Sequence, residues 1–182
     1  LAINPEQIRK DLAFFGQFGK KGVGYYVTEL KESIGSILGL DQHWNVAIIG
    51  MGHLGAALAN YQGIARLGFR LAAIFDANPV VIGTRVGERR VEDIAYLAEI
   101  IAERDIRIGV IAVPAAAAQD VADKLVAAGI RGIWNFAPVN LRVPPHIPFV
   151  SEDLSVGLSS LSYYLSHVSP DPNELSDKNS LN

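Results

Sequence analysis

The order of apolar and polar residues along the chain predicts strands and helices in alternation. Short apolar runs, typical of strands buried on both faces of a sheet, lie at residues 44–49, 70–75, 106–112, 130–135 and 149–150. Residues with helical periodicity lie between them, at 53–66, 92–103 and 115–128. This alternation indicates an α/β fold, and we expect a Rossmann-type parallel sheet.

The first forty residues follow another pattern, in which a polar helix precedes a basic, glycine-rich segment. Asn4 as cap, Pro5 at the first helical position and Gln7 in a capping box predict the helix start. The apolar face of this helix consists of Ile8, Leu12 and Phe15. A polar helix before a basic hairpin, here residues 16–26, is typical of the end of a winged helix-turn-helix unit. The alternative is a solvated helix face followed by a flexible loop.

A winged helix would place polar side chains of this region on DNA, with the helix in a major groove and the hairpin on backbone phosphate. The residues expected to face DNA are Gln7, Arg9, Lys10, Lys20 and Lys21. The net charge of the whole chain is −3, but basic residues are in excess over residues 1–31. A recognition helix needs earlier helices to bury its apolar side. We therefore expect either a fragment that lacks its N-terminal helices or a segment that packs on another surface.

A further helix is predicted after the basic segment, with Thr28 as its cap and Gly39 as its stop. Its buried stripe is expected to consist of Leu30, Ile34, Ile37 and Leu38. The short polar link that follows places a domain boundary near residue 40.

An amphipathic helix with one continuous apolar seam is predicted near the C-terminal end, beginning at Asp153. Its leucines repeat with 4-3-4 spacing, at Leu154, Leu158, Leu161 and Leu165. Residues 169–182 are polar, contain two prolines and are expected to be disordered. The seam is therefore expected to pack either on the chain's own sheet or on a partner subunit.

The first strand of the sheet ends in a glycine-rich turn, Gly50-Met51-Gly52-His53-Leu54-Gly55, which opens the next helix. Gly50 permits the tight turn, Gly52 lets the backbone approach a pyrophosphate, and Gly55 lets the helix pack closely on the strand. The start of the helix offers unpaired N–H groups to the phosphates. Glycine-rich turns also occur for structural reasons, so the motif needs a second observation.

An acidic residue at the end of the second strand supplies that observation. Asp76 lies 21 residues after Gly55, where a carboxylate can accept hydrogen bonds from the ribose diol of an adenine dinucleotide. Its charge would repel a 2′-phosphate, so NAD(H) is favoured over NADP(H). Arg85 lies close enough in the sequence to keep NADP(H) as the alternative.

Two further turns follow strands at the same edge of the expected sheet. They are Val113-Pro114 and Asn135-Phe136-Ala137-Pro138. Ligands of an open parallel sheet lie beyond the carboxyl ends of the strands, so these turns are expected to line the nicotinamide half of the site. The alternative for both is an ordinary turn that connects a strand to the next element and has no role in binding. His53 is expected either to meet the pyrophosphate or to be an exposed loop residue.

Composition and the remaining chemistry favour a regulator over an enzyme. The chain has 182 residues and 49% apolar content, enough for one medium domain and a small appendage. It has no cysteine, no metal-ligand spacing and no apolar run of membrane-spanning length, so we expect a cytoplasmic protein without a metal. Little of the chain remains outside the nucleotide fold to hold a substrate. The alternatives are a CoA- or nucleotide-binding enzyme subunit and a small NAD-dependent oxidoreductase.

Several of these segments together resemble the family of redox-sensing transcriptional repressors called Rex. The matching segments are Gln7 to Leu12, the wing from Gly19 to Tyr25, Gly50 to Gly55, Phe75-Asp76, Ile111 to Pro114, Asn135 to Pro138 and Asp153-Leu154. The resemblance implies a homodimer that binds operator DNA when NADH is scarce and releases it as the NADH/NAD⁺ ratio rises. It also implies that the C-terminal helix is exchanged between subunits.

The resemblance further implies roles for single residues and for the parts of the chain. Tyr61 and Asp153 are similar to a tyrosine and aspartate pair near the nicotinamide that takes part in sensing. The chain departs from the family at His53, where members often carry arginine. The expected parts are a partial winged helix-turn-helix DNA-binding domain without its N-terminal helices, an NAD(H)-binding Rossmann domain, a dimerisation helix and a disordered tail, at residues 1–40, 41–150, 151–168 and 169–182.

Overall fold

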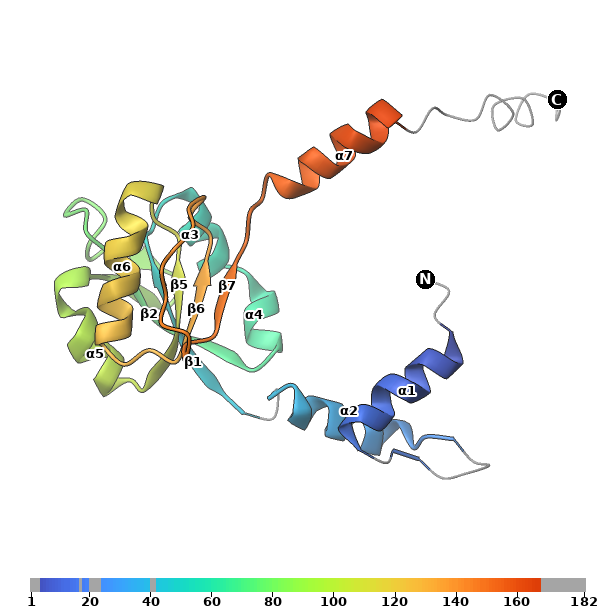
Figure 1. The fold of residues 1–182 in the computed structure, drawn as a ribbon. Helices are drawn as coiled ribbons and strands as arrows, with labels where there is room; N and C mark the ends of the chain where they lie inside the picture. The colour runs from blue at the N-terminus through green and yellow to red at the C-terminus, as the bar shows by residue number, and fades with distance from the viewer. Residues whose placement is uncertain (1–3, 17, 20–23, 40–41, 168–182) are drawn as a thin grey trace, which may run out of the picture.

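A computed structural model describes residues 4–16, 18–19, 24–39 and 42–167, within which seven strands form one sheet (Figure 1). The strands are β1 (Trp44–Ile49), β2 (Phe69–Asp76), β3 (Arg85–Val86), β4 (Arg89–Asp93), β5 (Ile106–Ile111), β6 (Gly132–Asn135) and β7 (Phe149–Ser151). Their order across the sheet is β3-β4-β2-β1-β5-β6-β7, and all neighbours are parallel except β3 and β4. The predicted Rossmann-type sheet is confirmed.

Some of the helices flank the sheet and others lie apart from it (Figure 1). They are α1 (Pro5–Phe15), α2 (Val27–Ile37), α3 (His53–Ala59), α4 (Gln62–Arg66), the 3₁₀-helix η1 (Ile94–Tyr96), α5 (Leu97–Glu103), α6 (Ala115–Ala127) and α7 (Val156–His167). Helices α3 to α6 flank the sheet, whereas α1, α2 and α7 lie apart from it. Helices α5 and α6 pack on one face, where Ile101 and Leu125 join Phe75 in the largest buried cluster. Helices α3 and α4 lie against β1 and β2, where a second, smaller cluster forms around Ile48.

The second face of the sheet is covered less completely than the first. Near β1 it is buried, as the low exposure of Val46 and Ile48 shows. Along β5, β6 and β7 the same face keeps apolar side chains that are partly buried or exposed. These are Ile108, Trp134, Phe136 and Val150. Burial of apolar surface is the main driving force of packing, so this half of the face is available to a further element.

The helix predicted over residues 53–66 is two helices, because the chain leaves helical geometry at Tyr61, directly after the end of α3 at Asn60. The Asn60 side chain donates from Nδ2 to the carbonyl oxygen of Ala56 (2.8 Å), at the end of α3. Tyr61 then adopts extended backbone (φ −77°, ψ 105°) and precedes the first residue of α4. The predicted span was correct, but its continuity was wrong.

The helix predicted over residues 92–103 was placed two residues too early at its start, since Glu92 and Asp93 belong to β4. The Asp93 side chain accepts a hydrogen bond from the backbone N–H of Ala95 (2.9 Å) and caps the 3₁₀ turn that leads into α5. The hairpin of β3 and β4 was not predicted, because Val91 is its one buried residue and its neighbours are charged.

The first helix begins where the sequence indicates. Asn4 Oδ1 accepts a hydrogen bond from the backbone N–H of Glu6 (2.9 Å), which confirms Asn4 as the cap. Gln7 instead donates its side-chain amide to Asp11 (2.8 Å), so the reciprocal capping box is not formed. The face of Ile8, Leu12 and Phe15 is exposed or only half-buried.

The second helix differs from its prediction at its start. Tyr26 is the residue before α2, so Thr28 lies inside the helix and the predicted cap was wrong. Gly39 has φ +67° and its N–H donates to the carbonyl oxygen of Ser36, as expected of a helix stop. The predicted stripe is not buried within the described residues: Leu30 and Ile34 are half-buried, and Ile37 and Leu38 are exposed.

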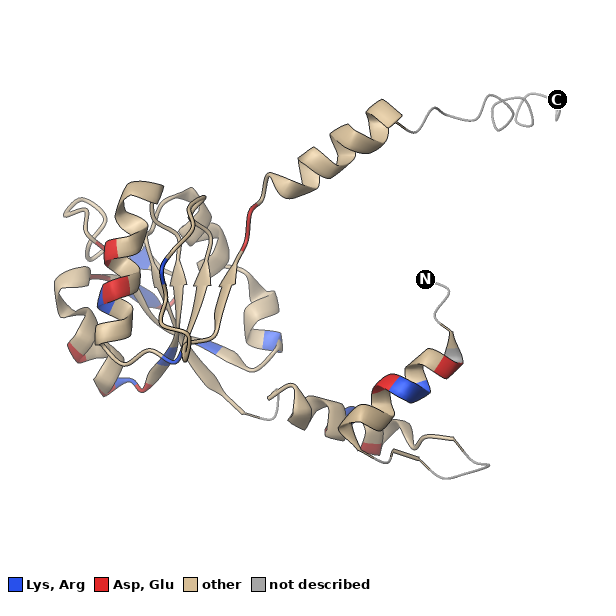
Figure 2. Ribbon diagram, in the orientation of Figure 1, with Lys and Arg blue, Asp and Glu red and all other residues tan. Residues whose placement is uncertain are grey.

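The C-terminal helix projects from the domain and leaves its apolar side in solvent (Figure 1). It begins at Val156, three residues later than predicted. The leucines of the seam are 66, 71, 58 and 85% exposed, at Leu154, Leu158, Leu161 and Leu165. Figure 2 shows no charged residue along α7. Among the described residues, no helix has both the length and the apolar character needed to span a membrane.

Candidate nucleotide-binding site

Two of the three glycines in the turn after β1 are required by the packing of the chain itself. Gly50 has a left-handed backbone (φ +97°), and a Cβ there would lie 2.6 Å from the carbonyl oxygen of Ala112. A Cβ at Gly55 would lie 1.9 Å from the carbonyl oxygen of Gly50. Side-chain carbons cannot approach backbone this closely, so only glycine fits at either position.

The middle glycine of the turn has no such constraint. Gly52 has φ −73° and ψ −169°, a conformation open to any residue, and a Cβ there would meet no atom within 4 Å. It directly precedes the first residue of α3, and the first N–H groups of a helix have no partner within the helix. A small residue with free space beside it, followed by the N–H donors of a helix start, fits a bound pyrophosphate.

The carboxylate of Asp76 lies at the end of β2 and is fixed by two backbone groups. Its Oδ2 accepts a hydrogen bond from Met51 N–H (2.6 Å), and its Oδ1 accepts one from Asn78 N–H (2.8 Å). A carboxylate oxygen can accept more than one hydrogen bond, so both keep capacity for a further donor. Asp76 therefore joins β2 to the glycine turn and can still receive the hydroxyls of a ribose.

The glycine turn and Asp76 line one cleft of about 380 Å³ at the carboxyl ends of β1, β2 and β5. Of the predicted residues, those at this cleft are Gly50, Met51, Gly52, Asp76, Val113 and Pro114. Arg85 pairs with Arg90 in the β3–β4 hairpin and is outside the lining of the cleft. His53, Leu54 and Gly55 are outside the lining of the cleft. His53 is exposed at the start of α3, Leu54 is half-buried and Gly55 is buried.

The remaining wall of the cleft was not predicted from the sequence. Val81, Ile94 and Val121 of α6 give the cleft an apolar lining, which suits a flat ring such as adenine. Asp120 and Lys124 of α6 stand at its margin and form an exposed ion pair of 2.7 Å. The sequence did contain a signal for this wall, because the spacing of Asp120, Val121 and Lys124 places them on one face of α6. No group of three His, Asp or Glu among the described residues could hold a metal ion.

The segment Asn135 to Pro138 lies outside the lining of this cleft. The Asn135 side chain is fully buried and is used by its own loop, where Oδ1 accepts from Ala137 N–H (3.0 Å). Phe136 packs against Trp134, with ring centroids 4.6 Å apart. The loop does begin beside the cleft, because Phe136 N–H donates to the carbonyl oxygen of Ile111 (2.9 Å) at the end of β5.

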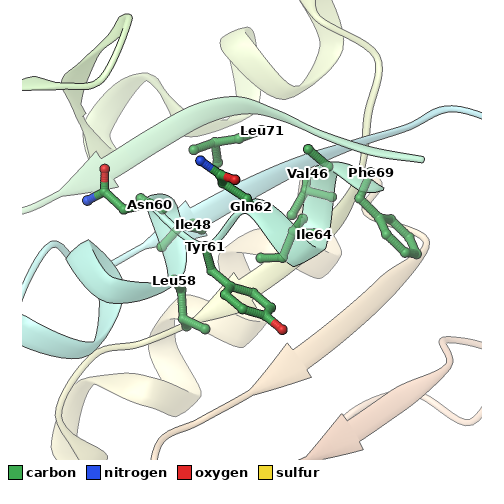
Figure 3. A pocket seen from close by; sticks show the side chains of 11 residues that line it. Val46, Ile48, Leu58, Asn60, Tyr61, Gln62, Ile64, Phe69 and Leu71 are labelled. Atoms are coloured by element: carbon green, nitrogen blue, oxygen red, sulfur yellow. The ribbon is translucent and has the colours of Figure 1, made fainter. Parts of the chain in front are cut away.

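Tyr61 lies on the incompletely covered face of the sheet. Its ring lies over Gly63, where a Cβ would approach the ring carbons to 2.4 Å. Figure 3 shows the side chain extending from the start of α4 beside Leu58 and Ile64, around a pocket of about 220 Å³. Tyr61 is 64% exposed and does not line the cleft of the glycine turn.

A larger apolar groove continues from Tyr61 across the exposed half of that face. Its volume is about 440 Å³, and α4, β1, β2, β5, β6 and β7 contribute to it. Among the residues that line it are Tyr61, Ile108, Trp134, Val150 and Glu152. We call this surface the sheet groove.

Asp153 lies just before α7 and carries a stabilised negative charge. Its Oδ1 accepts hydrogen bonds from the Ser155 hydroxyl (2.6 Å) and from Ser155 N–H (2.8 Å). These hydrogen bonds, the hydroxyl first, lower the pKa of Asp153 below its ordinary value of 3.8. The stability that these hydrogen bonds contribute is complete at a pH above the ordinary pKa, and it is lost as the pH falls through the lowered pKa. Asp153 is therefore anionic at neutral pH. Asp153 and Tyr61 share no hydrogen bond in the part of the chain that the structure describes.

The predicted DNA-facing side chains of α1 are exposed. Lys10 forms an exposed ion pair with Glu6 (3.6 Å), and the Gln7 amide donates a hydrogen bond to Asp11. Helix α1 thus carries both basic and acidic side chains (Figure 2). Arg9 is also exposed. Lys20 and Lys21 of the predicted wing lie outside the described residues, as do residues 168–182 of the C-terminal end.

Comparison with known proteins gives both sequence relatives and similar structures. Residues 41–139 match the protein family described as CoA binding domain. A redox-sensing transcriptional repressor Rex from Clostridium perfringens is 47% identical over 167 residues, which is 92% of this chain and 79% of the relative. A protein of the same name from Chloroflexus aurantiacus is 47% identical over 163 residues, 90% of this chain and 77% of the relative.

The similar solved structures include a protein called RSP, which is described as a Rex-family repressor. Its crystal structure with β-NAD⁺ and operator DNA has a TM-score of 0.87 and 42% identity, covering 97% of this chain and 79% of that chain. Its crystal structure with β-NADH has a TM-score of 0.81 and 40% identity, covering 97% of this chain and 80% of that chain.

Proposed function

We propose that the cleft of the glycine turn binds NADH and NAD⁺, because the chain belongs to the Rex family of redox-sensing transcriptional repressors. Its residues 41–139 belong to the CoA binding domain family. The observation that carries this proposal is the open space at Gly52 beside the fixed carboxylate of Asp76. RSP, a similar protein, has been crystallised with both forms of the dinucleotide.

CoA is the second candidate ligand, because the matched domain family is named for it. The ribose of CoA carries a 3′-phosphate and therefore lacks the free diol of NAD(H). The carboxylate of Asp76 lies at the end of β2 beside the glycine turn, where it would accept hydrogen bonds from a diol but repel a phosphate. NAD(H) is thus favoured over both CoA and NADP(H).

The ribose contact is tested by Asp76→Ala. We expect it to weaken NADH binding about 10- to 100-fold, because the diol loses a charged acceptor. The measurement is isothermal titration calorimetry, with melting temperatures recorded for each variant. Asp123→Ala, which removes an exposed carboxylate of α6 outside the cleft, is the matched control and should bind as the unmodified chain does. Equal NADH affinity in Asp76→Ala and in the control would contradict the ribose assignment.

The redox signal is proposed to act through charge. The oxidised nicotinamide ring is positively charged and the reduced ring is neutral, so an acid close to the ring interacts differently with the two forms. Asp153 is anionic at neutral pH, and Tyr61 lies on an exposed part of the chain that a ligand or second subunit can reach. We propose these two residues as the sensing pair and the Asn135 to Pro138 loop as a boundary of the nicotinamide half.

The output is proposed to be the release of operator DNA as NADH replaces NAD⁺. Residues 1–40 would supply part of a winged helix-turn-helix domain, with Gln7, Arg9 and Lys10 of α1 and Lys20 and Lys21 of the wing facing DNA. Residues 41–150 would form the NAD(H)-binding domain. The nucleotide is then a signal that is bound and released without being consumed, so no enzymatic activity is required. A repressor of this kind acts where bacterial DNA lies, in the cytoplasm.

A homodimer is proposed through α7 and the residues beside it, 151–168. The seam of α7 and the sheet groove are both apolar, and neither is covered by the residues that the structure describes. Helix α7 projects away from the domain, so it does not reach the groove of its own chain (Figure 1). A second copy can supply α7 to that groove and accept the other α7 in return, which buries both surfaces in one symmetric arrangement.

A further inference from the structure

One buried polar side chain has no part in the ligand contacts described so far. Asn135 is completely inaccessible to solvent and is the single buried polar residue of the described chain. Burying an amide is unfavourable unless its hydrogen bonds are replaced. Here both ends of the amide are bonded: Oδ1 accepts from Ala137 N–H (3.0 Å), and the two hydrogens of Nδ2 are shared among Ala137 O (2.9 Å), Ser151 Oγ (3.0 Å) and, at the longest distance, Val139 O (3.3 Å).

These hydrogen bonds join two segments that are far apart in the sequence. One is the loop of residues 136–139, which begins beside the end of β5 through the bond of Phe136 to Ile111. The other is the end of β7, where Ser151 is held by the Asn135 amide and Glu152 N–H donates to the Asn135 carbonyl oxygen (2.8 Å). Asn135 therefore fixes the loop and the end of β7 relative to each other.

The position of β7 determines where the chain leaves the domain toward α7. β7 has three residues and is the edge strand, paired with β6 alone. Beyond Ser151, the Glu152 carboxylate accepts from Trp134 Nε1–H (3.4 Å), and Asp153 follows at once. A short edge strand makes few ladder bonds, so the side-chain bond from Asn135 is a large share of what holds its end.

We propose that Asn135 is a positioning residue that couples the loop beside the nicotinamide half of the site to the segment carrying Asp153 and α7. A ligand that displaces residues 136–138 then displaces the start of α7, because one rigid, fully bonded amide holds both. The role rests on the proposed function and deepens it. It assigns to Asn135 the transmission of the redox signal rather than contact with the cofactor. Buried networks of this kind are rigid and cooperative, which suits transmission.

The coupling is tested by Ser151→Ala, which removes the side-chain bond between the two segments. It leaves the backbone bond from Glu152 N–H to the Asn135 carbonyl oxygen and the bonds of Asn135 within its own loop. We measure dissociation constants of NADH, NAD⁺ and ADP-ribose, which lacks the nicotinamide, by calorimetry. ADP-ribose affinity should stay within about twofold, while the ratio of the NAD⁺ and NADH dissociation constants should move toward one by about threefold or more, the effect of one hydrogen bond. Asn135→Ala should move the ratio further and lower the melting temperature.

Ser159→Ala is the matched control, since its hydroxyl is exposed on α7 and, among the described residues, bonds only the carbonyl oxygen of Ser155. It should leave the ratio unchanged. An unchanged ratio in Ser151→Ala, or a loss of ADP-ribose affinity as large as the loss of NADH affinity, would overturn the coupling role. Failure of the unmodified chain to bind NADH or NAD⁺ would instead overturn the proposed function, so the two failures are distinguishable.

Discussion

Gly52→Asp is expected to weaken NAD(H) binding strongly without destabilising the protein. Aspartate is among the best residues before the first turn of a helix, and the backbone of Gly52 is open to any side chain, so the melting temperature should be unchanged or higher. The new carboxylate would stand where the pyrophosphate is proposed to lie. Two like charges at contact cost about 4 kcal/mol near a protein surface, so affinity should fall roughly 100-fold or more.

Two further glycine variants control this result. Gly52→Ser adds a neutral side chain that also caps helices well, and it should weaken NADH less than Gly52→Asp does. Gly55→Ala should instead fail to fold or melt at a much lower temperature, because its Cβ would strike the Gly50 carbonyl oxygen. Calorimetry and thermal denaturation measure the two effects separately. Full NADH affinity in well-folded Gly52→Asp would show that the pyrophosphate binds elsewhere.

Leu158→Glu combined with Leu161→Glu is expected to convert a dimer into monomers. Both leucines lie in the seam of α7, which is proposed to enter the sheet groove of a second copy. Burial of one leucine contributes about 1.5–3 kcal/mol, and an unpaired charge in the groove adds a further penalty. The dimer should therefore weaken by roughly three orders of magnitude or more.

Sedimentation velocity at several protein concentrations measures this change. The matched control is Ser159→Glu combined with Ser160→Glu, which adds the same charge to the side of α7 away from the seam. The control should sediment as the unmodified chain does. A dimer that persists in the leucine double variant, or that dissociates equally in the serine control, would show that the seam is not the interface.

The sequence predicts most of the sheet, because its central strands are apolar along their whole length. The strands at 44–49, 70–75 and 106–112 were found to within a residue of their observed ends. The β3–β4 hairpin was missed, since a strand at the edge of the sheet buries only Val91 and keeps charged neighbours. The helix break after Asn60 was missed because apolar periodicity continues through it, and the hydrogen bond of the Asn60 side chain to the end of α3 leaves no periodic signal in the sequence.

The candidate site was predicted in composition but only in part in arrangement. The sequence shows three glycines at Gly50, Gly52 and Gly55 but not their different roles. The surrounding backbone requires glycine at Gly50 and Gly55, whereas Gly52 faces open space. Asn135 was expected at the ligand, yet its side chain is turned into its own loop. Whether a polar side chain at a strand end points to the ligand or to the backbone depends on loop geometry, which residue spacing does not encode.

Parallel titration of the unmodified chain with NADH, NAD⁺ and CoA tests the central claim most directly. The cleft beside Gly52 and Asp76 should bind both dinucleotides saturably, with NADH tighter than NAD⁺ by about fivefold or more, the lower end of the coupling that is typical of allosteric proteins. CoA should show no binding at concentrations that saturate the cleft with NADH. Saturable binding of CoA together with no response to NADH would contradict the account.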